Sequence, residues 1–203
     1  MSVIALHLVF TGYGHWLPND PRGSGSEDVR QQILDVLGPI HHGRKRIQPS
    51  RDLLRSFYRD ATPLLQHEVL WFDDAQRDRI GRAFGEEIQR RQYTCWACAV
   101  LRNHVHMCIR RHRDTDTIIW SCLANAAMGT LQNDASIAPD HPIWADRPYA
   151  MFLETPEDIQ RVIGYIQRNP MKEGLLEQRW DFVRPYDGWP FHKQAPRKGK
   201  PLR

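Results

Sequence analysis

The sequence predicts an α+β fold in which one antiparallel sheet has helices packed on it, in a ferredoxin-like or RRM-like arrangement. Three observations predict it. Residues 3–11 form an almost unbroken apolar run, as in a strand buried on both faces. Residues 93–101 and 104–110 have strand composition and are joined by a short turn at 102–103. Segments with helical periodicity alternate with these strands in the order β, α, β, β, α, β, α.

The chain has 203 residues, which is enough for one domain with a substantial core. No run of 18 apolar residues is present, and the N-terminal segment lacks the basic region and cleavage site of a signal peptide. We therefore expect a cytoplasmic protein without membrane contact, associated with the nucleoid if it binds DNA. Its four cysteines are too few and too clustered for a disulfide framework.

We expect a single domain over residues 1–185, with a basic insert at about 22–65, followed by a basic tail over 186–203. The loop at 12–26 is rich in Gly and Pro, and residues 26–65 are ambiguous, with a short helix near 27–37. Residues 41–59 carry six Lys or Arg against one Asp. Such a patch suits a phosphate backbone, although a basic surface of this kind is as often merely solvated.

Three further helices have clearer signals. Asp73 can cap a helix over 73–92, in which apolar residues recur at four-residue spacing. A second helix is expected over about 115–131, and 142–152 reads as a loop with an edge strand. The last helix begins with Thr155 as cap and a proline in its first turn. It should end near Asn169, because Pro170 disfavours helical geometry in the residue before it.

His104 and His106 are candidate metal ligands. A spacing of two along a strand puts both imidazoles on one face, about 6.5–7 Å apart along the backbone, from where they can converge on one ion. Val105 between them points to the opposite face and into the core. A histidine pair of this spacing is more often a surface or hydrogen-bonded pair, so it does not identify a metal site by itself.

Tyr165 and Asn169 lie one turn apart on the flank of the apolar face of the last helix. This flank is the boundary where the helix meets the sheet. An amide oxygen there can complete a metal site, and a phenol one turn earlier can reach what the metal holds. The alternative is a border tyrosine with an exposed hydroxyl and an asparagine that ends the helix.

Together these segments resemble a known family. AVLRNHVHMCI (99–109) and YIQRNPMKEGL (165–175) are similar to the strand and nucleophile helix of the HUH single-tyrosine transposases, closest to the REP-associated tyrosine transposases of bacteria. GYGHWLPNDPRGS (12–24) resembles a segment near the start of such proteins. Two positions depart from the pattern: Arg102 stands where a proline is common, and His15 where a small or hydroxylated residue is more usual.

The resemblance implies an HUH endonuclease fold and an enzyme that nicks single-stranded DNA and transfers the strand. In that case His104, His106 and Asn169 hold Mg²⁺ or Mn²⁺, which polarises the scissile phosphate. Tyr165 attacks the phosphorus and forms a 5′-phosphotyrosine intermediate, which a 3′-hydroxyl later reseals without ATP. The partner is single-stranded or hairpin DNA, and the resemblance leaves both a monomer and a homodimer open.

Several residues are candidates for DNA contacts. An aromatic side chain such as Trp16 can stack on unpaired bases, and basic side chains of the insert can hold the phosphates of a hairpin. The basic candidates are Arg44, Lys45, Arg46, Arg51 and Arg55.

Two alternatives remain. One is a zinc site in which Cys95 and Cys98 join His104 and His106; it is disfavoured because residues three apart on a strand point to opposite faces. The other is a non-catalytic DNA- or RNA-binding module derived from a transposase. Such a binder has no need of the complete set formed by the two histidines, the tyrosine and the asparagine.

Overall fold

The computed structural model describes residues 3–24, 32–132, 134–145 and 149–191. Its centre is a four-stranded antiparallel sheet with the strand order β2-β3-β1-β4. This order, with strands and helices following one another as β, α, β, β, α, β, is that of a ferredoxin-like sheet, so the predicted α+β class is confirmed. The sheet consists of β1 (Ala5–Thr11), β2 (Cys95–Val100), β3 (His104–Arg110) and β4 (Tyr149–Leu153).

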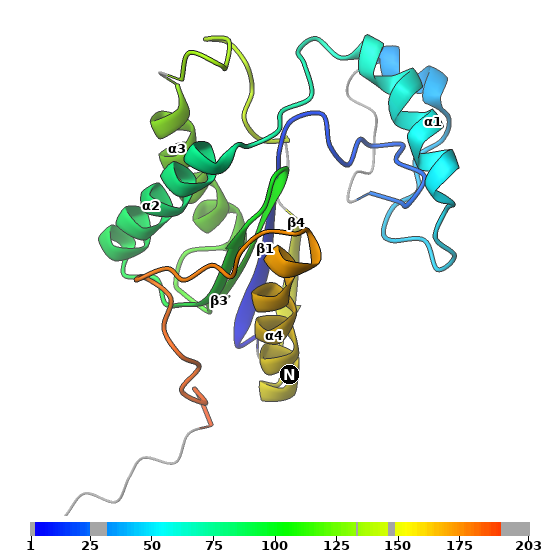
Figure 1. Ribbon diagram of the computed structural model, residues 1–203. Coiled ribbons are helices and arrows are strands. Elements are labelled where there is room, and N and C mark those ends of the chain that lie inside the picture. Colours follow the sequence, from blue (N-terminus) through cyan, green and yellow to red (C-terminus); the bar gives the residue numbers. More distant parts are fainter. Residues whose placement is uncertain (1–2, 25–31, 133, 146–148, 192–203) are drawn as a thin grey trace, which may run out of the picture.

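The sheet separates two apolar cores. Helices α2 (Asp74–Arg91) and α3 (Asp116–Leu131) pack on each other and on one face, while α4 (Pro156–Lys172) packs on β2 and β3 from the other face (Figure 1). The α2–α3 side holds large side chains such as Phe10 and Met107. The α4 side holds several small ones from the strands, including Ala97 and Ala99, together with Trp96. Small residues let α4 approach the backbone of β2 and β3 closely.

Strand β3 has the predicted alternation. Val105 and Met107 are fully buried on the α2–α3 side, whereas Cys108 is buried on the α4 side. The turn before the strand is also as expected, because the Leu101 amide donates to the His104 carbonyl at 2.8 Å across a tight hairpin. The face that carries His104 and His106 is therefore the face that α4 covers.

The last helix runs further than predicted. Asn169 was expected to end it, but α4 continues through Pro170 to Lys172. The proline lies in the final turn, where its missing N–H removes only one helical hydrogen bond. Gly174, with φ of 68°, then reverses the chain, and the Leu175 amide donates to the Pro170 carbonyl at 2.8 Å. Asn169 is thus inside the helix, with its side chain buried against the sheet side.

The ambiguous region forms a separate unit beside the sheet, at the top right in Figure 1. It contains the 3-10 helix η1 (Gln32–Leu37), the helix α1 (Arg51–Ala61) and a short 3-10 turn η2 (Thr62–Leu64). The helix expected near 27–37 is therefore a short 3-10 segment from residue 32, and residues 27–31 lie outside the described part. Helix α1 is capped by Ser50. It was not predicted from the sequence, because charged side chains surround its short apolar face.

The segment after α4 covers the edge of β2. Gln178 accepts from the Val100 amide at 2.8 Å and donates to its carbonyl at 2.7 Å, so it replaces a neighbouring strand there. Trp180 and Phe182 pack against α2. Further along, the Tyr186 ring lies 4.7 Å from that of Trp96. Within the described residues, no helix is both long and apolar enough to cross a membrane.

Candidate active site

The two histidines of β3 converge on one point. His104 and His106 are 8% and 7% exposed, and their rings lie 4.7 Å apart and nearly perpendicular. Their Nε2 atoms are separated by 3.1 Å. Two ligands held about 2.1 Å from one ion at right angles are about 3 Å apart, so this spacing fits a pair of neighbouring metal ligands.

A hydrogen-bonded chain fixes the proton on His104. The Leu70 carbonyl, which can only accept, lies 3.0 Å from Nε2 of His15, so that nitrogen carries the proton. Nδ1 of His15 then accepts from the Asn103 amide at 3.4 Å, which turns the amide oxygen of Asn103 toward His104. Nδ1 of His104 donates to that oxygen at 2.7 Å. The Nε2 atom of His104 is therefore unprotonated, and its lone pair can only accept or bind a cation.

His106 has a different neighbour. Its Nδ1 lies 3.0 Å from Nε2 of His7, a buried residue of β1. Strand β1 is paired with β3, and His7 stands opposite Cys108, so its side chain is on the same face as the two histidines. The site thus contains a third imidazole that was not among the predicted site residues.

Tyr165 faces this cluster from α4. Its ring centroid is 5.3 Å from that of His106 and 6.1 Å from that of His7, in both cases edge to face. The side chain is 39% exposed, so it is open to a ligand from solvent. The ammonium group of Lys172 lies 5.2 Å from the centre of the same ring and supplies positive charge beside the phenol.

Asn169 lies one helical turn after Tyr165 and is 7% exposed. The C-terminal end of α4 is tied to the turn before β3, because Arg102 donates to the Glu173 carbonyl at 2.6 Å. Asn169 therefore lies along the helix between this contact and Tyr165. The amide nitrogen of Asn169 is buried without a hydrogen-bond partner within the described residues. The amide of Asn169 can be flipped, which exchanges its nitrogen and its oxygen. A buried polar atom without a partner fits a site where a bound species supplies the missing interaction.

The imidazoles are held neutral. Burial lowers the pKa of His7 and of His104 to about 4, with a smaller contribution to His104 from His15 and Arg22. Burial also lowers the pKa of His106 well below its ordinary value, and His104 and His7 reinforce the effect. Neutral imidazole is the form that binds metal ions. The donor chemistry, nitrogen lone pairs with an amide nearby, therefore fits a divalent cation.

The zinc alternative is not supported by the geometry. The expectation that Cys95 and Cys98 point to opposite faces was wrong, because a register shift between Cys95 and Ala97 puts both in the core on the α2–α3 side. That side is away from the face that carries His104. Within the described residues, no group of three or more His, Cys, Asp or Glu side chains is arranged to hold a metal ion. A metal site here would need a ligand of another type besides the two histidines.

Trp16 lies beside the histidine pair, with its ring 5.6 Å from that of His104. Its backbone has φ of 48°, a left-handed conformation that is strained for a tryptophan. The Trp16 amide donates to the Tyr58 hydroxyl at 2.9 Å, and the Arg22 guanidinium lies 4.0 Å above the indole. Both Arg22 and Tyr58 bind the fully buried carboxylate of Asp20.

The basic candidates of the insert are on its surface and not in contact with the histidines. Arg44 and Arg46 are exposed, Lys45 is half-buried, and Arg51 and Arg55 are exposed in the first part of α1. Arg55 lies 3.7 Å from Asp52, a pair so exposed that it leaves the guanidinium accessible. Tyr58, also on α1, links this unit to Trp16 and so to the site.

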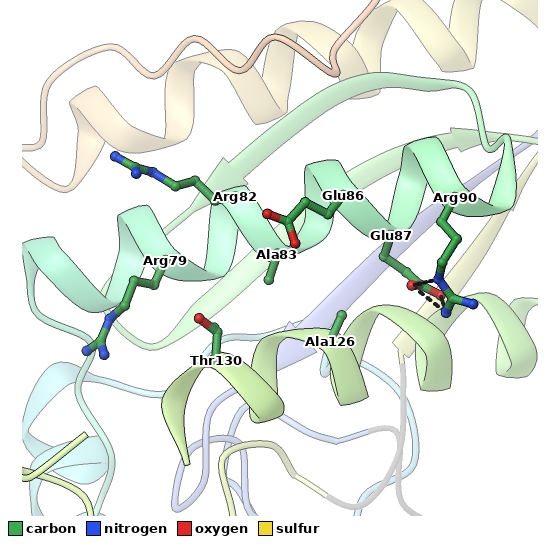
Figure 2. A pocket seen from close by; sticks show the side chains of 8 residues that line it. All are labelled: Arg79, Arg82, Ala83, Glu86, Glu87, Arg90, Ala126 and Thr130. Atoms are coloured by element: carbon green, nitrogen blue, oxygen red, sulfur yellow. Dashed lines mark hydrogen bonds and ion pairs between the residues drawn. The ribbon is translucent and has the colours of Figure 1, made fainter. Parts of the chain in front are cut away.

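A hollow of about 450 Å³ lies between α2 and α3, on the opposite side of the sheet (Figure 2). Its three arginines are engaged by acids: Arg79 with Asp134, Arg82 with Asp78, and Arg90 with Glu87. It holds none of the predicted site residues.

Comparison with known proteins gives structural likenesses only. No protein-family model matches the sequence, and no curated protein does. A solved REP-associated tyrosine transposase bound to a REP hairpin is similar over 90% of this chain and 76% of its own, with a TM-score of 0.47 and 14% identity. A Deinococcus radiodurans R1 protein assigned as a transposase is similar over 83% of this chain and 92% of its own, with a TM-score of 0.39 and 10% identity. At these values neither likeness carries an argument about what this chain does.

Proposed function

We propose that this chain nicks and rejoins single-stranded DNA, with Tyr165 as a covalent nucleophile beside a divalent cation held by His104, His106 and Asn169. The observation that carries the proposal is the approach of the Tyr165 ring to 5.3 Å from His106, whose Nε2 converges with that of His104. A phenol and two neutral imidazoles meet at this junction of helix and sheet, and the buried amide of Asn169 lies one helical turn after the phenol. Such a set of side chains suits phosphoryl transfer, because a protein that only binds DNA has no need of a nucleophile beside metal ligands.

The residues of the chain have distinct tasks in this reaction. A bound Mg²⁺ or Mn²⁺ supplies charge neutralisation at the scissile phosphate. The Tyr165 oxygen forms a bond to phosphorus while the bond from phosphorus to the 3′ oxygen breaks. The phenol gives up its proton and the leaving 3′ oxygen gains one, so the products are a 5′-phosphotyrosine and a free 3′-hydroxyl. Lys172 beside the ring stabilises the developing phenolate.

The strand also needs a path to this site. Trp16, braced by Arg22 and in contact with His104, offers an aromatic surface on which the nucleotide beside the scissile phosphate can stack. The insert reaches the site through Tyr58, so its basic side chains are suited to the phosphates of a neighbouring hairpin. Asp20 binds both Arg22, which lies over Trp16, and Tyr58 of the insert. A DNA strand that contacts Trp16 and the insert is therefore held in a fixed position relative to Tyr165.

Covalent capture tests the proposal. The protein is incubated with Mn²⁺ and a pool of single-stranded and hairpin DNAs, labelled at either the 3′ or the 5′ end. We expect an adduct that resists sodium dodecyl sulfate only with the 3′ label, because the downstream fragment remains on the tyrosine. Tyr165→Phe should abolish it, whereas Tyr149→Phe, at an exposed tyrosine of β4, should not.

The outcomes separate the two functional classes. DNA binding without any adduct in the wild-type protein supports the non-catalytic DNA- or RNA-binding module. An adduct that persists in Tyr165→Phe excludes Tyr165 as the nucleophile.

A further inference from the structure

We infer that His7 is a positioning residue, which holds His106 with its Nε2 atom directed at the cation. The inference rests on the proposed metal site and adds to it a residue outside the ligand set. His7 contacts neither the cation nor the reacting atoms in this scheme. It acts through the Nδ1 atom of His106, from which its Nε2 is 3.0 Å away.

The position of His7 follows from strand pairing. His106 stands opposite Val9 and Cys108 stands opposite His7, so His7 and His106 are diagonal neighbours on one face of adjacent strands. Long side chains reach each other across such a diagonal. His7 is 5% exposed, and its ring is 5.0 Å from that of His106. The pairing of β1 with β3 therefore sets the orientation of the His106 ring.

The proton positions show why the neighbour of His106 must be able both to donate and to accept. Nε2 of His104 can only accept, because Asn103 takes the proton on its Nδ1. Without an ion, the 3.1 Å contact needs a proton on Nε2 of His106, whose Nδ1 then accepts from Nε2 of His7. With an ion bound, Nε2 of His106 must be a lone pair, so its proton moves to Nδ1 and is donated to Nε2 of His7. His7 then carries its own proton on Nδ1.

Each imidazole carries one proton in both arrangements, so the imidazoles neither release nor take up a proton when the ion binds. The residue next to His106 must donate from one atom in the first state and accept at the same atom in the second. Neutral histidine does this by changing tautomer. Lysine or arginine only donates, and an ionised carboxylate only accepts. A ligand imidazole oriented through its second nitrogen is a general requirement of metal sites.

The other nitrogen of His7 supports this assignment over a packing role. Its Nδ1 is buried and has no hydrogen-bond partner within the described residues. Most buried polar atoms in native proteins have a partner, so an unpaired nitrogen calls for an explanation. Here the contact with His106 is the polar bond that the structure gives to the His7 ring. The bond that His7 does make is therefore the one that orients His106.

The inference is tested by calorimetric titration of the metal-free protein with Mn²⁺ alone, in the absence of DNA. Replacing His7 by Phe removes the bond and should weaken Mn²⁺ binding about 10- to 100-fold, the usual effect of losing a partner of a ligand histidine. His7→Gln, whose amide can donate or accept near the same place, should restore affinity to within about threefold of wild type. His112→Phe, at a partly buried histidine near Tyr93, is the matched control and should bind normally.

Nuclear magnetic resonance of ¹⁵N-labelled imidazoles gives a second readout that does not depend on a variant folding. In wild type, His7 should be protonated at Nε2 without metal and at Nδ1 when saturated with Mg²⁺. An unchanged tautomer, or equal Mn²⁺ affinity in wild type and His7→Phe, overturns the inference alone. Absence of Mn²⁺ binding in wild type removes the proposed metal site as well, so the two failures are distinguishable.

Discussion

The ring of Tyr165 meets that of His106 edge to face, with centroids 5.3 Å apart and planes at 76°. One residue belongs to α4 and the other to β3, so their meeting depends on how closely the helix approaches the sheet. Ala99 stands opposite His106 in the strand pairing and is fully buried beneath α4. The small side chain at this position is what allows the approach.

Ala99→Leu should therefore separate the nucleophile from the histidines. Overpacking of this kind costs about 1–3 kcal/mol of stability, and here the strain is relieved by moving α4 outward. We expect covalent adduct formation with DNA to fall at least about tenfold, since a misplacement of about 1 Å in a reacting group costs up to 100-fold. Gel analysis of the adduct measures the effect.

Ala127→Leu is the control for this substitution. Ala127 is also fully buried, but in α3 on the other face of the sheet. It should lose comparable stability in urea unfolding and keep adduct formation at temperatures where it is folded. Equal adduct loss in both variants would show that stability, not the position of α4, limits the reaction.

Acid should destabilise the metal-free protein through its buried histidines. The pKa of His7 and of His104 is lowered from 6.5 to about 4 by burial, so between these values the unfolded chain binds more protons than the folded one. The free energy of unfolding therefore falls as pH decreases from about 6.5 to about 4, by on the order of 3 kcal/mol for each histidine. Urea unfolding in EDTA over this range measures it. His104→Gln should show a shallower dependence, and an identical slope would contradict the assignment.

The sequence was sufficient where a pattern is local. The period of two in β3 predicts that His104 and His106 share one face of the strand. The spacing of four residues in α4 predicts that Tyr165 and Asn169 share one flank of the helix. It was insufficient where a pattern depends on pairing between distant strands. His7 lies in an apolar run without alternation, so nothing in the run marks its face; only the β1–β3 register does.

Side-chain contacts made by the loops also could not be predicted from the sequence. His15 was noted as a departure from a family pattern, yet its bond to the Leu70 carbonyl begins the chain that orients His104. The partners of this chain are far apart in sequence and joined by irregular backbone, which has no periodicity to read. Asp20 and Arg22, which brace Trp16, were missed for the same reason. A Gly- and Pro-rich loop predicts turns, not which side chains meet.

Two helical glycines offer a matched test of how the C-terminal segment is held. A Cβ on Gly81 in α2 would lie 2.2 Å from the Trp180 ring, whereas one on Gly129 in α3 would meet no atom within 4 Å. Gly81→Ala should therefore displace Trp180 and destabilise the protein by about 1–3 kcal/mol. Gly129→Ala should stabilise it by up to about 1 kcal/mol through helix propensity. Urea unfolding measures both, and stabilisation by Gly81→Ala would show that Trp180 does not pack there.

The basic insert should contribute to DNA binding through charge. Replacing Arg44, Lys45 and Arg46 with Ser removes up to three phosphate contacts, each of which adds about 0.7 to the salt dependence of single-strand binding. The slope of log K against log salt should then become shallower by about two units. Fluorescence anisotropy at several salt concentrations measures it. Arg82→Ser and Arg90→Ser, at ion-paired arginines of α2, should leave the slope unchanged.

Trp16 should contribute to binding through stacking instead. Its strained backbone, with φ of 48°, is held by the Tyr58 hydroxyl, and burial together with Asp20 keeps the pKa of that hydroxyl raised, so Tyr58 remains a neutral partner. Strain maintained at an exposed aromatic residue beside His104 indicates that the indole is presented for contact. Trp16→Ala should weaken single-stranded DNA binding by about 1–3 kcal/mol, since one stacked base is lost, and leave the salt slope unchanged. Phe152→Ala, at an exposed aromatic of the edge strand β4, is the control and should bind as wild type. A reduced salt slope in Trp16→Ala would mean that the indole positions Arg22 for a phosphate and does not itself stack on a base.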